Sequence, residues 1–397
     1  MRQIFDRVQF LVGNENVITN MKRVPVLPLF SPKVLDFLSD LSCKIMEDSQ
    51  AKQYPDVISI AFWLRRAHMK KVSETYRSQA QKIGRGMAFH IAPSNIPVQF
   101  VVSLVYALTA GNASVVRVSD KNFPQINIFC QKINELLNGK WKDFKPYICV
   151  IRYGHDVNIT QYLTNICDVR LIWGGDNTVN SIRNIAVPPR CIDLGFADRY
   201  SIAVFDSEAI LHGDKRKIAE AFYNDTYFVD QNACSSPRII VWLGKNISKS
   251  KEIFWNELEK IVKRKYSLNP ISASNKLLNT ALFAAIHDDS REVKNNNYIV
   301  RLEVKKLSED IMDYKENAGY FFEYNADSII ELIPILKKKC QTVVFIGNIE
   351  NEIRETISNY GLRGVDRIVP VGNGTNISFV WDGLDLPNVL SRQIGKH

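Results

Sequence analysis

Between residues 86 and 193, short apolar runs alternate with segments whose apolar residues recur at helical spacing. The runs are rich in the β-branched and aromatic residues that favour strands, and each is only a few residues long. Strands that alternate with helices in this way build a parallel sheet. We therefore predict five strands, at GMAFHIA (86–92), SVVRV (114–118), YICVI (147–151), VRLIW (169–173) and RCID (190–193).

Proline and glycine mark the helices between these strands. Pro97 and Pro124 each open a helical pattern, and Gly111 and Gly139 end them. Proline is favoured in the first turn of a helix and glycine just after the last turn. The pattern predicts an α/β fold with a doubly wound parallel sheet, whose helices cover residues 97–110, 124–139, 157–166 and a segment from about 178.

The rest of the chain also reads as mixed α/β. A length of 397 residues exceeds the roughly 250–300 residues at which single cores stop growing. We predict a cofactor domain at 1–198, in which 1–80 carry no usable motif, a catalytic domain at 199–365 and a return segment at 366–397. In the catalytic domain the predicted strands are YSIAVF, RIIVWL, YIVRL and QTVVFIG, and the predicted helices cover 215–228, 252–265 and 327–338.

Charge and hydrophobicity narrow the class of protein. The net charge is +9, but the basic residues are dispersed and lack interleaved stacking aromatics, so no nucleic-acid partner is predicted. The longest apolar run, Val98–Ala110, is too short to span a bilayer. Asp6, Arg7 and Asn14 interrupt the N-terminal apolar residues, which argues against a signal peptide. We expect a cytoplasmic protein without an integral membrane segment.

Seven cysteines lie far apart and form no C-x-x-C pair, so we predict no metal site. Cys234 differs from the others because small residues flank it in DQNACSSPR, on a predicted loop between a helix and a strand. An accessible thiol that becomes ionised is a nucleophile. The alternative is a buried structural thiol.

Ligands of doubly wound sheets bind outside the carboxyl ends of the strands. Asn95 follows the first strand there, and either caps the next helix or donates its amide to a developing oxyanion. The glycine-rich dinucleotide fingerprint and the P-loop are both absent. A nicotinamide cofactor would therefore bind in a variant manner.

Several segments together resemble a known superfamily. APSNIP, AGNASVVRVSD, IWGGDNTV, IDLGFADR and DQNACSSPR occur in the order found in aldehyde dehydrogenases. Within that superfamily the chain is most similar to the LuxC-type acyl-CoA reductases, the reductase subunits of the bacterial luciferase fatty-acid reductase complex. GVDRIVPVGNGTNISFVWDGLDL (364–386) carries the same resemblance, which extends over about 85–390.

The resemblance implies an aldehyde-dehydrogenase-like fold and a role for each matched residue. It makes Cys234 the nucleophile and Asn95 an oxyanion-hole donor. The residues that it implies for the cofactor are Arg117, Ser119 and Asp120 at the adenosine ribose, Gly154 and His155 beside the adenine, and Gly174 and Gly175 over the pyrophosphate.

The chain departs from the superfamily pattern at three places. Asp193 stands where hydrolytic members have a glutamate base, and either acts as a base or merely closes a strand by bonding its own turn. No E-x-F-G-P segment, whose glutamate holds the nicotinamide ribose in many relatives, is found. Arg117 replaces a usual lysine, which favours NADPH because a guanidinium binds a 2′-phosphate bidentately; NADH is the alternative.

The implied reaction is reduction of a fatty acyl thioester, from acyl-CoA or an acyl-protein, to a fatty aldehyde through a Cys234 acyl-enzyme. The resemblance also implies an acyl-protein synthetase or a thioesterase as the source of the acyl group, and a homo-oligomer. One alternative is an NAD(P)-dependent aldehyde dehydrogenase that oxidises its substrate to an acid or to acyl-CoA. Another is a non-catalytic nucleotide-binding scaffold.

Overall fold

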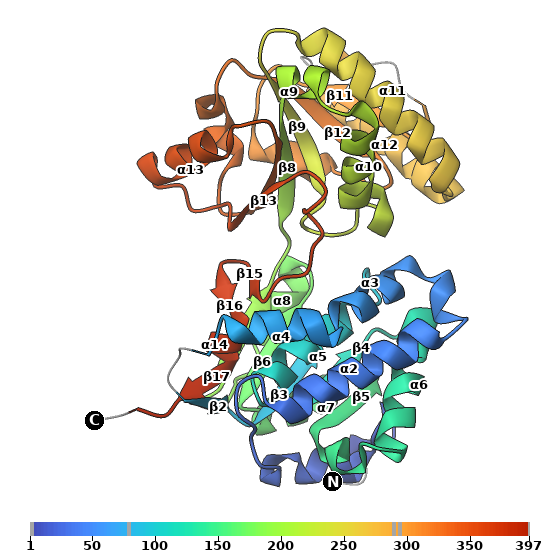
Figure 1. Ribbon diagram of the computed structural model, residues 1–397, viewed down its shortest axis with the longest axis vertical. Coiled ribbons are helices and arrows are strands. Elements are labelled where there is room, and N and C mark those ends of the chain that lie inside the picture. Colours follow the sequence, from blue (N-terminus) through green and yellow to red (C-terminus); the bar gives the residue numbers. More distant parts are fainter. Residues whose placement is uncertain (1–3, 78–80, 288–290, 293–295, 396–397) are drawn as a thin grey trace. The chain divides into compact units, whose positions relative to one another are not determined.

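The structure, a computed structural model, describes residues 4–77, 81–287, 291–292 and 296–395. The chain divides into two compact units (Figure 1). Unit 1 consists of Met1–Ala197 and Ile377–His397, and unit 2 is Asp198–Asn376. Unit 2 thus ends at Asn376, whereas the sequence predicted that the catalytic domain ends at residue 365. Unit 2 is an insertion between two parts of unit 1.

Unit 1 is built on a six-stranded sheet that is parallel except for one edge strand, β1. The strands that were predicted between residues 86 and 193 are all present, and the last of them begins two residues later than RCID suggested. Along the sheet the order is β1 (Gln9–Val12), β5 (Ile148–Arg152), β4 (Ala113–Val118), β3 (Met87–Ile91), β6 (Val169–Trp173) and β7 (Ile192–Phe196).

Helices surround this sheet, and several come from the N-terminal segment in which the sequence showed no usable motif. Among these, α2 lies beside α6 (Figure 1). The helices of unit 1 are α1 (Glu15–Asn20), α2 (Pro32–Glu47), α3 (Pro55–Trp63), α4 (Arg66–Glu74), α5 (Gln99–Thr109), α6 (Pro124–Asn138), α7 (Val157–Ile166), α8 (Asp176–Arg183) and α14 (Leu386–Leu390).

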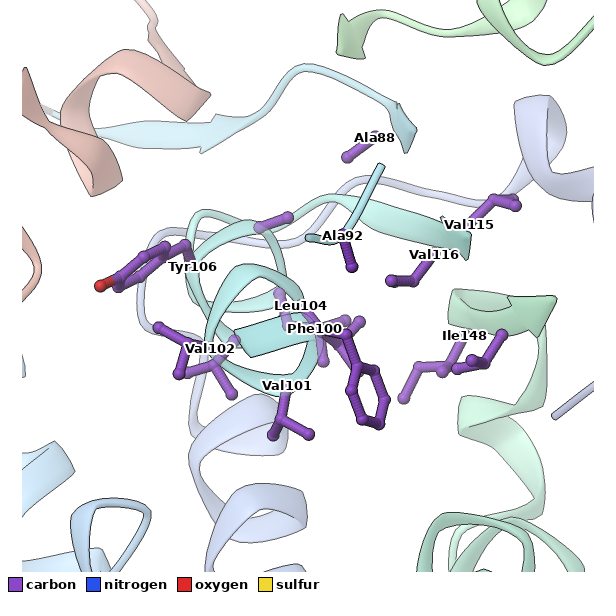
Figure 2. Close-up of a cluster of buried hydrophobic side chains, with 14 of the residues drawn as sticks. Ala88, Ala92, Phe100, Val101, Val102, Leu104, Tyr106, Val115, Val116 and Ile148 are labelled. Carbon is purple, nitrogen blue, oxygen red and sulfur yellow. The ribbon is translucent and has the colours of Figure 1, made fainter. Parts of the chain in front are cut away.

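Helix α5 is buried along almost its whole length. Figure 2 shows Phe100 of α5 pointing toward Ile148 of β5, with Val115 and Val116 of β4 nearby. A helix that is apolar on all sides is stable only inside a core, which explains the long apolar run of the sequence. It ends before Gly111, whose φ of +91° suits glycine and where a Cβ would lie 1.9 Å from the Leu27 carbonyl oxygen.

Asn112, the residue after this glycine, joins the two parts of unit 1. Its side chain is fully buried and accepts hydrogen bonds from the backbone N–H groups of Arg85 and Gly86. The same amide donates to the carbonyls of Ala107 and Leu390. The returning segment also adds strand β17 (Ser391–Gln393) to β2 (Lys82–Gly84). It further carries a small hairpin of β15 (Val380–Trp381) and β16 (Leu384–Asp385).

Unit 2 is built on a seven-stranded sheet, parallel except for β10. Successive residues of β8 face opposite sides, so Ile202 and Val204 enter one core and Ala203 and Phe205 the other. The order is β10 (Arg291–Glu292), β11 (Val300–Glu303), β12 (Tyr320–Asn325), β9 (Pro237–Leu243), β8 (Tyr200–Asp206), β13 (Cys340–Ile346) and β14 (Arg367–Pro370).

Helices cover both faces of this sheet. On one face lie α9 (Ser207–His212), α10 (Lys215–Thr226) and α11 (Ile247–Lys265). On the other lie α12 (Pro270–Ile286), α13 (Glu350–Asn359) and the 3₁₀-helices η6 (Glu309–Tyr314) and η7 (Ile329–Ile335).

Unit 2 differs from the prediction in several places. The predicted helix over 327–338 is the short 3₁₀-helix η7, which contains Pro334, a residue without the N–H that an α-helix needs. Helix α12 and strand β12 were not predicted. In α12 the polarity is inverted, because Lys276 is buried while Leu277 and Leu278 are exposed.

In the described parts of the chain, no helix is both long enough and apolar enough to cross a lipid bilayer.

Candidate active site

The carboxyl edge of the unit 1 sheet gathers the residues implied for the cofactor. Chain order reverses between β3 and β6, since β4 and β5 lie on one side of β3 and β6 and β7 on the other. Such a reversal leaves a crevice at the strand ends, where doubly wound folds bind ligands. Asn95 follows β3 and the pair Gly174 and Gly175 follows β6, so these residues flank the reversal.

Asn95 is exposed on the loop after β3 and does not cap the next helix. Helix α5 begins at Gln99, its N-cap is Val98, and no side chain bonds that end. The capping alternative for Asn95 is therefore wrong. An exposed amide at the carboxyl edge of the sheet is available to a ligand.

Residues at and after the end of β4 present both charge and hydroxyl groups. Arg117 Nη2 donates to the Tyr153 carbonyl at 3.1 Å, and the guanidinium lies 5.4 Å from the centre of the Tyr153 ring. Ser119 is buried, and its hydroxyl accepts from the N–H of Lys121 at 3.2 Å. Asp120 is exposed beside it. This side of the crevice can offer a cation and hydrogen-bonding groups to a nucleotide.

Arg152, which was not singled out in the sequence, lies at the end of β5. Its Nε donates to the Ser119 carbonyl at 3.1 Å. Its Nη2 is buried and has no hydrogen-bond partner among the described residues. A buried, unsatisfied guanidinium nitrogen is costly unless a ligand completes it. The available signal was its position directly after the predicted strand YICVI (147–151).

The glycine loops leave room for a cofactor. A Cβ at Gly154 or Gly175 would meet no described atom within 4 Å, whereas a Cβ at Gly174 would lie 3.1 Å from Thr178. Gly175 is the N-cap of α8, a helix end that suits anions because its backbone N–H groups point outward. His155 is exposed on the loop with Gly154. Together with the two arginines, these features fit a dinucleotide that carries phosphates.

Asp193 takes part in an ion pair with a buried arginine of the neighbouring strand. Arg170 and Asp193 are directly paired residues of β6 and β7. Arg170 Nε donates to Oδ1 at 2.8 Å and Nη2 donates to Oδ2 at 2.7 Å, and Arg170 is only 1% exposed. Asp193 thus bonds across the sheet and not within its own turn. A carboxylate engaged on both oxygens is a poor candidate for a general base.

In unit 2, Cys234 lies on the loop between the 3₁₀-helix η5 (Tyr227–Val229) and β9. The residue is half-buried, and its carbonyl accepts a hydrogen bond from the Ser201 hydroxyl at 2.7 Å. Ser235 and Ser236, which follow it, are buried. The loop is therefore held at its backbone, while small neighbours keep the surroundings of the thiol open.

Gln231 holds this loop against the segment before β12. Its side chain is fully buried, and its Oε1 accepts from the N–H groups of Gly319 and Tyr320 at 3.0 and 3.1 Å. Its Nε2 donates to the carbonyls of Pro237 and Tyr320. All four hydrogen-bonding positions of the amide are used. The backbone of Gln231 adopts a left-handed conformation with a φ of 58°, which this network stabilises.

Two buried cations brace the same region. Arg238 donates to the Gln231 and Glu316 carbonyls. Burial lowers the pKa of Arg238, and the charges of Cys234, Asp198 and Glu316 act in the opposite direction. A cation that interacts with a thiolate favours its ionised form.

Lys276 of α12 is the second of these cations, and it donates to the Ala318 and Asn297 carbonyls at 2.7 and 2.6 Å. Burial lowers its pKa to about 8.

The segment Glu316–Tyr320 is a feature that the sequence analysis missed. It reads E-N-A-G-Y and leads into β12, whose first residue is Tyr320. A glutamate thus stands three residues before a glycine, as in E-x-F-G-P. The Ala318 N–H donates to the Asp230 carbonyl, which joins the segment to the nucleophile loop. The Glu-x-x-Gly spacing was the available signal.

Asn95 belongs to unit 1 and Cys234 belongs to unit 2, and the surroundings of each are those of its own unit. Across the ranges that the structure describes, no group of three or more His, Cys, Asp or Glu side chains could hold a metal ion.

Comparison with known sequences places these residues in a family. A family model described as acyl-CoA reductase (LuxC) matches residues 15–391. The long-chain acyl-protein thioester reductase of Aliivibrio fischeri is 24% identical over 296 residues, which cover 72% of this chain and 58% of that protein. The long-chain acyl-protein thioester reductase 2 of Photobacterium leiognathi is 24% identical over 305 residues, which cover 72% of this chain and 59% of that protein. The matches thus span less than two thirds of the relatives' length.

Solved structures share the fold at low sequence identity. An indole-3-acetaldehyde dehydrogenase with NAD+ gives a TM-score of 0.67 at 11% identity and covers 96% of this chain and 86% of that one. A glyceraldehyde-3-phosphate dehydrogenase from Methanocaldococcus jannaschii with NADP gives a TM-score of 0.64 at 15% identity and covers 95% of this chain and 91% of that one. A lactaldehyde dehydrogenase gives a TM-score of 0.65 at 13% identity and covers 89% of this chain and 82% of that one. The predicted aldehyde-dehydrogenase-like fold is confirmed.

Substituting Asn for Asp193 is expected to reduce stability more than chemistry. The change removes the charged partner of the buried Arg170, which then keeps only neutral acceptors, namely the new amide oxygen and the carbonyls of Ile182 and Ile185. Breaking a buried pair costs about 3–5 kcal/mol, less where one partner is partly exposed. Denaturant unfolding should show a loss of about 2–3 kcal/mol, whereas the rate of acyl-enzyme formation should stay within about tenfold. A normal stability together with a rate lowered by about 10²–10⁴ would identify Asp193 as a base.

Replacing Gln231 by Glu should destabilise unit 2. A carboxylate cannot donate to the Pro237 and Tyr320 carbonyls, and each buried group left unsatisfied costs about 1–3 kcal/mol. We expect a lower denaturation midpoint. Gln161→Glu, the same change at an exposed position of α7, is the control. Equal midpoints in the two variants would show that the network does not hold the loop.

Proposed function

Since the chain belongs to the LuxC family of acyl-CoA reductases, we propose that it reduces a fatty acyl thioester to a fatty aldehyde. The observation that carries the proposal is the loop of Cys234. A half-buried thiol stands there between small residues, on a backbone held by Ser201 and Gln231. Such a loop can present a nucleophile without moving it.

In the proposed reaction the Cys234 thiolate attacks the carbonyl carbon of the thioester. A new sulfur–carbon bond forms, and the thiol of CoA or of a carrier protein leaves. The positive charge of Arg238 favours the thiolate that begins this step. The acyl group stays on Sγ during reduction, and release of the aldehyde returns the cysteine. Asn95 is proposed as a donor to the oxyanion, on the basis of the resemblance and its exposed amide.

We propose NADPH as the cofactor, which supplies the hydride when bound. Arg117 and Arg152 lie at the ends of the adjacent strands β4 and β5, and guanidinium groups bind phosphates through paired hydrogen bonds. Ser119 and Asp120 would hold the adenosine ribose, Gly154 and His155 would border the adenine, and Gly174 and Gly175 would face the pyrophosphate.

Glu316 is proposed to take the place of the glutamate that holds the nicotinamide ribose in relatives. Its carboxylate accepts hydrogen bonds from Asn279 Nδ2 at 2.8 Å and from the Asn317 N–H at 3.1 Å. These bonds fix the carboxylate on the segment that braces the nucleophile loop. A held carboxylate loses less conformational entropy when a hydroxyl group binds to it.

The acyl donor is proposed to be acyl-CoA or an acyl-protein, with an acyl-protein synthetase as partner and a homo-oligomeric enzyme. Oxidation of an aldehyde to an acid is disfavoured, because that reaction needs an activated water and Asp193 is engaged by Arg170.

The central test is removal of the thiol by Cys234→Ala. We expect no covalent acyl adduct by intact-mass spectrometry after mixing with long-chain acyl-CoA, and no aldehyde product, because no other sulfur stands on this loop. Cys43→Ala removes an exposed thiol and should leave both signals unchanged. Full activity in Cys234→Ala would exclude the mechanism, and bound NADPH without any turnover in the unaltered protein would favour the scaffold alternative.

Arg117→Ala tests the choice of cofactor. The KM for NADPH should rise by about tenfold or more, since a charge-assisted hydrogen bond contributes about 1.5–3 kcal/mol, while the KM for NADH should change little. Steady-state kinetics with both cofactors provide the measurement. Arg190→Ala, at an exposed arginine before β7, serves as the matched control. Equal effects on NADPH and NADH would mean that Arg117 does not contact the 2′-phosphate.

A further inference from the structure

Two cysteines that the proposed reaction does not use lie in contact in unit 1. The sulfur atoms of Cys167 and Cys191 are 3.7 Å apart. Cys167 lies two residues before β6, and Cys191 directly precedes β7. The two strands are parallel neighbours, with Val169 and Ile192 paired. In this register Cys191 stands opposite Asp168, so Cys167 and Cys191 are diagonal neighbours, one residue apart in register, at the starts of two adjacent strands.

The geometry suits a covalent bond between them. A disulfide needs Cα atoms roughly 4.4–6.8 Å apart. Neighbouring strands are spaced about 4.8 Å apart and rise about 3.3 Å per residue, so a diagonal pair offset by one residue lies about 5.8 Å apart, within that range. The Ile192 N–H donates to the Asp168 carbonyl at 3.1 Å, which holds the two strand starts at this spacing. A small rotation of either side chain would bring the sulfurs from contact to bonding distance.

The two thiols differ in access and acidity. Cys167 is 2% exposed, whereas Cys191 is half-buried and reachable from solvent. The hydrogen bond between them lowers the pKa of Cys191 and raises the pKa of Cys167. By contrast, burial raises the pKa of Cys130 and of Cys340 to about 12. Cys191 is therefore the member of the pair that reacts first, and Cys167 the one that follows.

We propose that Cys167 and Cys191 are an oxidative modification site, which a hydroperoxide converts to a disulfide. The Cys191 thiolate attacks one peroxide oxygen, so that a sulfur–oxygen bond forms, the oxygen–oxygen bond breaks and an alcohol or water leaves. Cys167 then attacks the Cys191 sulfur, and hydroxide departs and takes the proton of Cys167 as water. Two thiols are oxidised by two electrons, and the hydroperoxide is reduced.

The site lies away from the proposed chemistry. It is at the amino ends of β6 and β7, whereas Gly174 and Gly175 follow the carboxyl end of β6. The disulfide would close a loop from residue 167 to residue 191 that contains α8. Cross-linking limits the unfolded chain, so the oxidised protein should be the more stable form.

The test treats the full-length protein with hydrogen peroxide, alkylates remaining thiols and digests with trypsin without reduction. Cleavage after Arg170, Arg183 and Arg190 places the two cysteines on separate peptides. We expect a linked pair with a mass roughly 2 Da below the sum of the reduced peptides, which dithiothreitol separates. Cys191→Ser should abolish it, and Cys43→Ser should keep it. Sulfinic acid at Cys191 with an alkylated Cys167 would overturn the proposal.

Thermal unfolding gives a second readout that does not depend on activity or on Cys234. Oxidised wild-type protein should melt a few degrees higher than reduced protein, a shift of the size expected for a domain of about 200 residues. Dithiothreitol should reverse the shift, and Cys191→Ser should show none. The proposal would be overturned if wild-type protein gave the linked peptides after digestion but melted at an unchanged temperature. That result would mean that the bond forms in unfolded or aggregated material.

Discussion

The buried amide of Gln231 is the constraint on which the loop of Cys234 depends. Four hydrogen bonds tie it to the segment before β12 and to the start of β9. An amide in a dry interior is tolerated only when its donors and acceptors are all paired, and then it specifies one arrangement of the backbone. The backbone at Asp230 and Gln231 accordingly keeps a left-handed conformation, which a β-branched residue would disfavour.

Unit 1 uses the same device at a different place. Asn112 also satisfies both ends of its amide with backbone groups, and it does so where α5 gives way to β4. The two amides play one physical role, because each fixes a connection at which regular secondary structure cannot pair its own backbone groups. One connection lies at the amino edge of the unit 1 sheet, where β3 and β4 begin, and the other lies beside the loop of Cys234.

The sequence predicted those parts of the fold whose signals are local. Buried parallel strands appear as short apolar runs, and Pro124 and Gly139 mark the ends of α6 as expected. Helix α12 escaped prediction because its lysine faces inward and its leucines outward, which reverses the usual amphipathic pattern. The 3₁₀-helix η7 showed apolar spacing that also suits an α-helix, and only Pro334 distinguished them.

The candidate site was predicted unevenly for a related reason. Cys234 and the glycine loops lie within continuous motifs, so their types and spacing were visible. The pairing of Arg170 with Asp193 depends on the register of two strands, and the bracing by Lys276 joins residues 42 positions apart. A single sequence contains no sign of which distant residues meet. The sequence places Arg152 directly after a predicted strand, but it does not show the unsatisfied nitrogen, which is a property of packing.

The insertion of unit 2 into unit 1 has a consequence for synthesis on the ribosome. Residues 198–376 emerge in full before the segment that supplies β17 and the Leu390 carbonyl. Until that segment arrives, strand β2 has no β17 beside it and the amide of Asn112 lacks one acceptor, a cost that disfavours a closed unit 1. Unit 2 can therefore complete its folding before β17 is available to unit 1, so the order of folding is the reverse of the order in which the two units begin.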